Sequence, residues 1–182
     1  QSPDFNGLGT LQTIKNWWMT GCQMLLNPRF QGLSSLNSVG NRWMSSCDSL
    51  QSPNFDGLGK LNRVGHSWIS RCSRLLNPRF QGLSSLDRVE SYWMHSCNSL
   101  QSPNFNDLGN LLTVDNYWMS NCPMLSNPDF KGLSSLNSVG NYWMSSCNSL
   151  QSPNFDGLGK LKSAGHSWIS RCSRLLNPRF QG

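Results

Sequence analysis

The fold is decided by the stretch from Pro28 to Leu50, which reads PRFQGLSSLNSVGNRWMSSCDSL. Its pattern, P-x-F-x-G-L-x-x-L-x-x-V-x-x-x-W-M-x-x-C-x-x-L, recurs with few exchanges every 25 residues, without insertion or deletion. A fixed period of this length predicts a solenoid, in which each unit forms one coil that stacks on its neighbours. We expect a single solenoid over residues 1–182, with the units 1–25, 26–50, 51–75, 76–100, 101–125, 126–150 and 151–175 and a partial unit 176–182.

The apolar positions of this pattern predict the core. A 25-residue unit cannot bury its apolar side chains alone, whereas stacked units place equivalent residues in continuous rows. We call a set of positions related by steps of 25 residues a column. The Leu, Phe, Val, Trp and Cys columns are expected to point inward. The Phe column holds Phe5, Phe30, Phe55, Phe80, Phe105, Phe130, Phe155 and Phe180, and the Trp column holds Trp18, Trp43, Trp68, Trp93, Trp118, Trp143 and Trp168.

The spacing of the apolar positions also indicates the local structure. Steps of two and three residues favour short strands and turns over helix pairs. One candidate strand surrounds each Pro-x-Phe and the other is the segment from Leu36 to Val39 and its equivalents. Proline cannot donate to a sheet ladder, so either the first strand is short and irregular, or the second is better paired, or both form narrow parallel sheets. The W-M-x-x-C segment has the spacing of one short helical or 3₁₀ turn.

A second period of 50 residues lies on the first, because odd units begin with Gln-Ser-Pro and even units carry Asn-Pro. The units 51–75 and 151–175 differ only at the pairs Asn62/Lys162, Arg63/Ser163 and Val64/Ala164. Such recent duplication explains much of the sameness without any functional constraint. The informative positions are therefore those at which the units differ.

Composition narrows the class of protein. Hydrophobic residues make up 37% of the chain and charged residues 13%, with a net charge of +6. The eight Trp and eight Phe argue against disorder. The basic residues form no run that indicates nucleic acid binding, and no apolar stretch approaches the ~18 residues that span a membrane. The chain opens on Gln1 within the repeat pattern and without a signal peptide, so we expect a fragment or mature form of a longer protein.

The segment from Cys47 to Cys72 carries a resemblance to a known family. It reads CDSLQSPNFDGLGKLNRVGHSWISRC and resembles the BspA-like class of leucine-rich repeats, whose units run C-x-x-L-x-x-I-x-I-P, then V-x-x-I-G, then an apolar pair. Cys47 and Leu50 match the opening of such a unit. Val64-Gly65 match the I-G pair, and Trp68-Ile69 match the apolar pair.

The resemblance extends over the whole chain and implies a leucine-rich-repeat-like, right-handed coil with short parallel strands and turns. The units depart from the family pattern, since each is a couple of residues longer, Pro53 replaces a strand aliphatic, and Trp replaces a smaller residue. The family implies a repeat array at the cell surface or in secretions, which takes part in adhesion to other proteins, and it implies no catalytic residues. An intracellular location stays open.

The residues that carry chemistry elsewhere form no such site in this sequence. The seven cysteines fall one per unit, without the C-x₂₋₄-C spacing of zinc sites. In-register side chains point alike, so they do not face each other as a disulfide requires, and we expect a column of buried free thiols. The three histidines form no site, and no catalytic triad or phosphate loop is present. The sequence therefore predicts no enzyme, no metal and no cofactor.

Two sets of residues are candidates for ligand binding. The column before the core Trp varies most in chemistry, and Tyr and Arg are favoured interface anchors. The alternative is that its aromatics only cover the Trp column. The second set is basic and suits acidic partners or anionic glycans, and its alternative is an ordinary solvated surface. The first set comprises Trp17, Arg42, Tyr92, Tyr117 and Tyr142. The second comprises Arg29, Arg79 and Arg179, which share a column, and Arg71, Arg74, Arg171 and Arg174, which lie near the corresponding turns.

Three functions compete at this point. The leading hypothesis is a protein-binding, adhesin-type array. The second is a structural protein that assembles through the uncapped ends of its solenoid, because the first and last units resemble interior ones. The third is carbohydrate binding along the strip formed by Tyr92, Tyr117 and Tyr142. None of them involves nucleic acid or insertion of this segment into a membrane.

Overall fold

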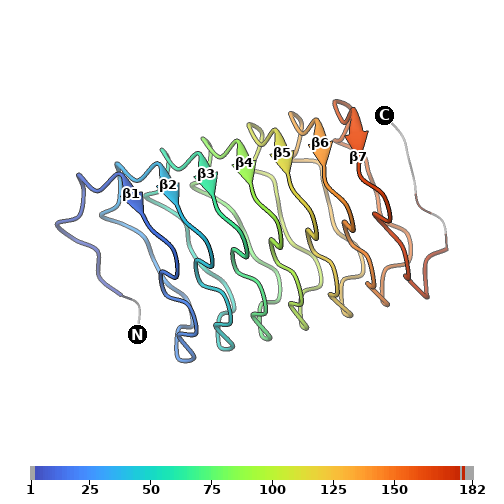
Figure 1. Cartoon of the computed structure of the whole chain (residues 1–182), viewed down its shortest axis with the longest axis horizontal. Helices are drawn as coiled ribbons and strands as arrows, with labels where there is room; N and C mark the ends of the chain where they lie inside the picture. The colour runs from blue at the N-terminus through green and yellow to red at the C-terminus, as the bar shows by residue number, and fades with distance from the viewer. Residues whose placement is uncertain (1–2, 177, 179–182) are drawn as a thin grey trace.

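The computed structural model describes residues 3–176 and 178, so most of the partial unit 176–182, with Arg179 and Phe180, lies outside the described residues. The described chain forms an elongated stack of coils, which follow one another from blue to red in Figure 1. Each coil contributes one short strand. The strands are β1 (Thr13–Ile14), β2 (Ser38–Val39), β3 (Arg63–Val64), β4 (Arg88–Val89), β5 (Thr113–Val114), β6 (Ser138–Val139) and β7 (Ser163–Ala164).

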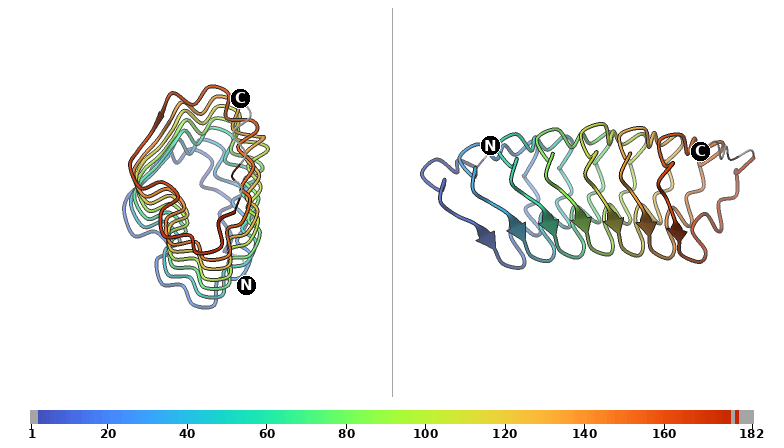
Figure 2. Two further views of the ribbon diagram at one scale, coloured as in Figure 1. Left: turned by 90° about the vertical axis from the view of Figure 1, so that its right-hand side faces the viewer. Right: turned by 90° about the horizontal axis from the view of Figure 1, so that it is seen from above.

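The seven strands form one parallel sheet in the order of the sequence. The register is uniform, since Thr13 lies opposite Ser38 and Val39 opposite Val64, each pair being 25 residues apart. Figure 2 shows the consequence from two sides, because the coils superpose when viewed along the stack and the arrows form a single row when viewed from above. The predicted solenoid with short parallel strands is confirmed.

The structure also decides between the two candidate strands. The continuous sheet lies at the segment that ends in Val39 and its equivalents, whereas the Pro-x-Phe segment forms only isolated bridges. The residue that follows each proline makes these bridges, because proline itself has no N–H to donate. They join Arg29 to Asn54, Arg79 to Asn104, Asn104 to Asp129 and Asp129 to Asn154.

The predicted columns form the core. Trp43 and its equivalents through Trp143 are fully buried, as are the Phe, Leu and Cys residues of the repeat pattern in the interior coils. Equivalent rings stack, with 5.4 Å and 6° between Trp43 and Trp68. The Phe column meets the Trp column edge to face, as for Phe30 and Trp43 at 5.2 Å and 69°. Each interior ring is therefore held by aromatic neighbours in its own coil and in the next, an arrangement that aromatic pairs prefer.

The predicted helical or 3₁₀ turn at W-M-x-x-C is wrong. No helix occurs among residues 3–176, and this segment alternates through positive φ, with 61° at Arg42, 52° at Met44 and 57° at Ser46. A right-handed helix requires negative φ at successive residues. The N–H groups of these three residues instead donate to neighbouring coils, to the carbonyls of His66 at 2.6 Å, Trp18 at 3.0 Å and Ser70 at 2.8 Å.

Asparagine side chains lock neighbouring coils together next to the strands. The Oδ1 atom of Asn41 accepts the N–H of His66 at 3.0 Å, and that of Asn16 accepts the N–H of Asn41 at 2.8 Å. In both cases the residue before the donor is glycine, Gly65 or Gly40, and a Cβ there would collide with the asparagine. The same arrangement joins Asn116 with Gly140 and Asn141 with Gly165.

Candidate functional site

A long groove runs along the solenoid beside the Trp column. It consists of two hollows, of about 340 Å³ and about 500 Å³, which both include His95 in their lining. Three columns line it. One rim is the column before the core Trp, the floor is the column that contains Ser45, and the second rim is the column that contains Ser46. The groove extends from Thr20 and Arg42 at one end to Ser170 and Arg171 at the other.

The first rim brings together three of the predicted site residues. The rings of Tyr92 and Tyr117 stack at 4.7 Å and 3°, and those of Tyr117 and Tyr142 stack at 4.9 Å and 8°. Each ring therefore covers a face of its neighbour, and the edges of the rings remain toward the groove and solvent. Further along the same rim, the guanidinium of Arg42 lies 4.3 Å from the ring centroid of Trp17, within the range of a cation–π contact.

The tyrosines form an aromatic layer separate from the core. Their ring contacts among the described residues are with each other and with histidine rings, Tyr92 with His95 at 5.4 Å and Tyr142 with His166 at 5.2 Å. The core Trp rings instead pair with Phe and Trp rings. All three tyrosines lie at positive φ, between 58° and 68°, a conformation that is costly for residues other than glycine and asparagine.

The floor of the groove is a column of hydroxyl groups interrupted by one histidine. Ser70, Ser120 and Ser170 each donate a hydrogen bond at 3.1 Å to the carbonyl oxygen three residues earlier, which belongs to the first rim. In the coil between Ser70 and Ser120, His95 takes the place of the serine. The hydroxyl column holds the first rim in place, and His95 divides the groove into its two hollows.

Both ring nitrogens of His95 have partners. Nδ1 lies 2.7 Å from the hydroxyl of Ser120, and Nε2 lies 2.9 Å from the hydroxyl of Ser96. Because the Ser120 hydroxyl donates to the carbonyl of Tyr117, it accepts the hydrogen bond that Nδ1–H of His95 donates, and the Ser96 hydroxyl donates to Nε2. This assignment gives a neutral ring. Burial and the charge of Arg71 agree with it, since both lower the pKa of His95, while the hydrogen bond with Ser120 partly offsets them.

The second rim carries two of the three arginines of the groove, the third being Arg42 on the first rim. Arg71 lines the smaller hollow and Arg171 the larger one, with Asn121 and serines between them. No aspartate or glutamate lines either hollow. The ion pairs among the described residues lie elsewhere, between His66 and Glu90 and between Arg88 and Asp115. The arginines of the groove therefore have no acidic partner within the described chain.

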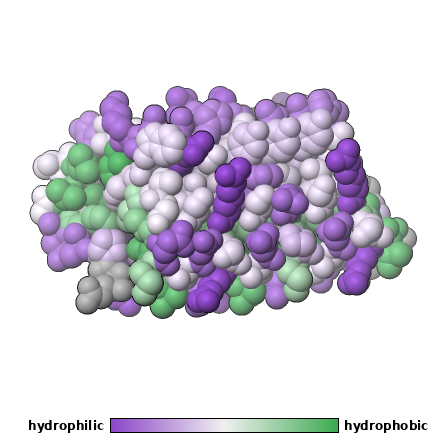
Figure 3. Space-filling view, turned by 60° about the horizontal axis from the view of Figure 1, so that its bottom comes forward, coloured by the Kyte–Doolittle hydropathy of each residue, from purple (hydrophilic) through white to green (hydrophobic). Residues whose placement is uncertain are grey.

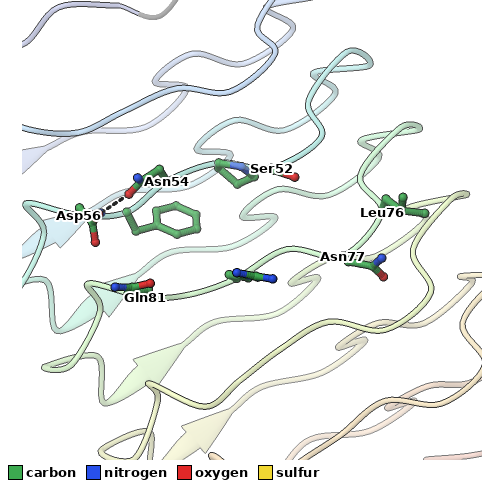
Figure 4. A pocket seen from close by; sticks show the side chains of 9 residues that line it. Ser52, Asn54, Asp56, Leu76, Asn77 and Gln81 are labelled. Carbon is green, nitrogen blue, oxygen red and sulfur yellow. Dashed lines mark hydrogen bonds between the residues drawn. The ribbon is translucent and has the colours of Figure 1, made fainter.

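The predicted basic set is divided by the structure. Arg71 belongs to the groove, whereas Arg79 lines a separate pocket of about 490 Å³ between two coils. Figure 4 shows this pocket, with Asn54 and Asp56 on one coil and Asn77 and Gln81 on the next. It opens where the bridges of the Pro-x-Phe segment are interrupted, since no bridge pairs Asn54 with Arg79 among the described residues. Arg29 and Arg74 line neither this pocket nor the groove.

Sequence reasoning missed the floor of the groove. The floor serines repeat in most units and were indistinguishable from the abundant serine of the surface. Thr20 and His95 are the two exchanges in their column, and His95, which alone lacks a hydroxyl, was the available signal. Arg171, which was predicted together with Arg71, lies four coils further along and lines the larger hollow.

The cysteines take no part in the groove. Cys47 through Cys147 are buried free thiols, whereas Cys22 is exposed and Cys172 is half-buried. The thiol of Cys97 donates to the carbonyl of Ile69 at 3.1 Å, and the other described thiols from Cys47 onward repeat this bond with the preceding coil. Burial raises the pKa of the Cys47 thiol to about 11 and that of Cys147 to about 12. The predicted column of buried thiols is confirmed for the interior coils.

The surface in Figure 3 shows mostly hydrophilic and intermediate side chains between the two ends of the solenoid. Apolar side chains gather toward the ends and along one edge of this view. The large apolar residues that are exposed, such as Leu26, Leu76 and Leu112, lie in separate coils or columns. Scattered apolar residues of this kind are common on soluble proteins.

The coil architecture agrees with the comparison of the sequence with known families. The model of the BspA type leucine rich repeat region, which comprises six copies, matches residues 4–126 and, in a second overlapping match, residues 79–181. The chain belongs to the BspA type leucine-rich repeat family. The resemblance between the segment from Cys47 to Cys72 and this family is thereby confirmed over the whole array.

A solved structure shares the fold. A leucine-rich repeat protein from Bacteroides ovatus ATCC 8483 superposes with a TM-score of 0.65 and 18% sequence identity over 95% of this BspA-type chain. The chain spans 48% of the length of that protein. A search of curated protein sequences finds no match. None of the described residues forms a helix of the length and hydrophobicity needed to cross a bilayer.

Proposed function

We propose that this BspA-type array is non-enzymatic and binds another protein through the groove, as an adhesin-type surface displayed on a cell or secreted. The observation that carries the proposal is the stack of Tyr92, Tyr117 and Tyr142 along one rim. Positive φ is a property of this column and not of the tyrosines, since Ser67 and Ser167 have it too, at 61° and 58°. Serine, which occurs at the equivalent Ser67 and Ser167, is a far smaller side chain, so the tyrosines add contact area that the coil itself does not need.

The geometry favours a protein partner over a carbohydrate. A sugar ring binds an aromatic residue by lying on a free ring face, and here Tyr117 has both faces covered by its neighbours. The exposed features are ring edges, hydroxyl groups and arginines, which suit the carbonyl and carboxylate groups of a polypeptide. The exposed apolar residues between the two ends are scattered, which gives little support to self-assembly through a side of the solenoid. Apolar side chains gather toward the ends, so assembly through the ends is the second candidate function.

The test is selection of ligands from a displayed library of random peptides on the wild-type protein. Each selected peptide is then measured against the variant in which Tyr92, Tyr117 and Tyr142 are all serine. A matched control changes Arg63, Arg88 and Thr113 on the strand face to serine, the residue found at the equivalent Ser38, Ser138 and Ser163.

The expected result is that affinity falls at least about tenfold in the tyrosine variant, the loss of a typical interface anchor, and is unchanged in the control. Circular dichroism and the Tm of both variants report whether the fold is retained. Selected peptides that bind all three proteins equally, or a selection that yields no ligand, would overturn the proposed site.

A further inference from the structure

The two ends of the tyrosine stack carry the same chemistry. Ser67 and Arg71 precede the stack, and Ser167 and Arg171 follow it. Both arginines line the groove, and both are held at nearly the same backbone angle, with φ of 56° and 57°. A cationic position therefore lies on the same rim on each side of the tyrosines.

The separation of the two arginines defines the length of a ligand. They are four coils apart, and neighbouring parallel strands are about 4.8 Å apart, so the arginines are separated by about 19 Å along the solenoid. An extended polypeptide advances about 3.3 Å per residue. A segment that reaches both arginines therefore has about six residues from one contact to the other.

The lining between the arginines offers hydrogen-bond donors and positive edges. The rim of an aromatic ring carries partial positive charge, and Tyr92, Tyr117 and Tyr142 present their edges because their faces are stacked. The amide of Asn121 donates to the hydroxyl of Ser96 at 2.9 Å and retains a second N–H. These groups match backbone carbonyl oxygens, and the absence of acidic residues from the lining matches a negatively charged ligand.

We infer that the groove binds an extended acidic peptide segment of a partner protein, with one carboxylate at Arg71, a second about six residues away at Arg171, and backbone carbonyls along the tyrosine edges between them. This inference rests on the proposed function and specifies the partner chemistry of the same groove. Neither arginine forms an ion pair within the described chain, so neither must break a salt bridge to receive a carboxylate.

The pKa of His95, which lines both hollows of the groove, reports binding of a ligand. Its ring contacts Tyr92 and Tyr117 and its nitrogens bond to Ser96 and Ser120. Arg71 is the charged group that acts on it. A peptide in the groove adds to the burial that lowers the pKa of His95, and its carboxylate at Arg71 offsets the positive charge that also lowers it, so the pKa of His95 shifts on binding.

The experiment uses fluorescence anisotropy with labelled synthetic peptides and the whole chain. The first peptide has two aspartates about six residues apart, the second has them about three residues apart, and the third has asparagine at both positions of the first. The protein variants are Arg71→Ser and Arg171→Ser, which introduce the residue of the equivalent Ser46, Ser96 and Ser146. Arg63→Ser, on the strand face, is the matched control.

The first peptide is expected to bind most tightly, and each groove variant to weaken it by about tenfold, as for the loss of a charge-assisted hydrogen bond. Added salt weakens the binding further. The Arg63→Ser control leaves the affinity unchanged, and NMR titration shows the pKa of His95 shifted in the complex. Equal affinity for the aspartate and asparagine peptides, or no effect of Arg71→Ser and Arg171→Ser, would overturn the inference.

Two outcomes separate this inference from the proposed function. Library ligands that require the tyrosines but bind independently of both arginines would leave the protein-binding function standing and refute the acidic segment. Arginine-dependent binding of a sulfated heparin fragment, without binding of any aspartate peptide, would assign the groove to an anionic glycan and overturn both proposals.

Discussion

The side chain of Asn41 occupies the space that a Cβ atom on Gly65 would need, one coil further along the solenoid. The relationship is general among the described coils. Where a coil carries this asparagine, the next coil has glycine at the position equivalent to Gly65. Where a coil has His66 or Ser91 instead of the asparagine, the next coil has Glu90 or Asp115 at that position. The exchange of one residue is therefore matched by an exchange 24 positions later.

Substituting Gly65→Ala is expected to lower the free energy of unfolding by about 1–3 kcal/mol, because the added methyl group meets Asn41 and the backbone of Gly40. Urea denaturation measures this change. In the background of Asn41→Ser the cost of Gly65→Ala should be smaller, since part of the collision is removed. Strict additivity of the two substitutions would contradict the pairing.

Gly59→Ala is the control for this pair. A Cβ on Gly59 meets nothing within 4 Å, and Ser34 and Ser84 occupy the equivalent position in neighbouring coils. The expected change is within about 0.5 kcal/mol.

Ile69 follows a core Trp and is a β-branched residue with a positive φ of 42°. The residues at the equivalent position of other coils include Met44 and Met119, with φ of 52° and 51°. Positive φ strains a β-branched residue more than it strains methionine. The substitution Ile69→Met is expected to stabilise the protein by up to about 1 kcal/mol, and Met119→Ile to destabilise it by about 1–2 kcal/mol. Thermal unfolding of the two single variants measures both shifts. Changes of the same sign would show that packing, and not φ, decides the residue at this position.

The thiols should react in an order set by burial. Cys22 is exposed and is expected to react with a chromogenic disulfide reagent at once, whereas Cys72, Cys97 and Cys122 should react only when the protein unfolds. Desolvation by burial raises the pKa of these three thiols well above the ordinary value, which removes the reactive thiolate at neutral pH. Cys22→Ser should abolish the fast phase. A fast phase of several thiols in the native protein would refute the buried column.

Stability should decrease as the pH falls below the ordinary histidine value of 6.5, because the pKa of His95 is lowered in the folded state, first by burial and then by Arg71. Below 6.5 the unfolded chain binds a proton that the folded chain does not, so protonation favours unfolding. The loss continues down to the folded-state pKa. Denaturant titrations above and below pH 6.5 measure it, and His95→Ser, which restores the serine of Ser70 and Ser120, should reduce this dependence. An unchanged slope in His95→Ser would assign it to other groups.

The 25-residue period was sufficient to predict the solenoid and its core columns, because burial of Phe30, Trp43 and Cys47 follows from stacking alone. It was not sufficient to predict the turn after Trp43. That segment has the apolar spacing of a helical turn, and only Gly21 and Asn121, in the column of Ser46, indicated the left-handed conformation that the backbone adopts there.

The candidate site was predicted only in part, for a physical reason. Variation among units identified Tyr92, Tyr117 and Tyr142, since an exchange in a column marks a surface position. Whether Arg71 or Arg79 joins them depends on the path of the backbone around the coil, which the period does not specify. The structure places the first on the groove and the second in another pocket.

The match between asparagine and glycine limits how such an array can change its length by recombination. The pairing repeats every four coils, so insertion or excision of four consecutive coils leaves every junction with a compatible pair. Excision of the two coils 51–100 would instead bring Asp115 onto Asn41, and its Cβ would enter the space that Gly65 leaves open. Excision of four coils is therefore tolerated wherever it occurs, whereas a shorter excision is tolerated only where glycine still follows the asparagine, as when removal of coil 26–50 places Gly65 after Asn16. A block of 100 residues is also the distance between Arg71 and Arg171, so each added block would supply one more arginine to the groove.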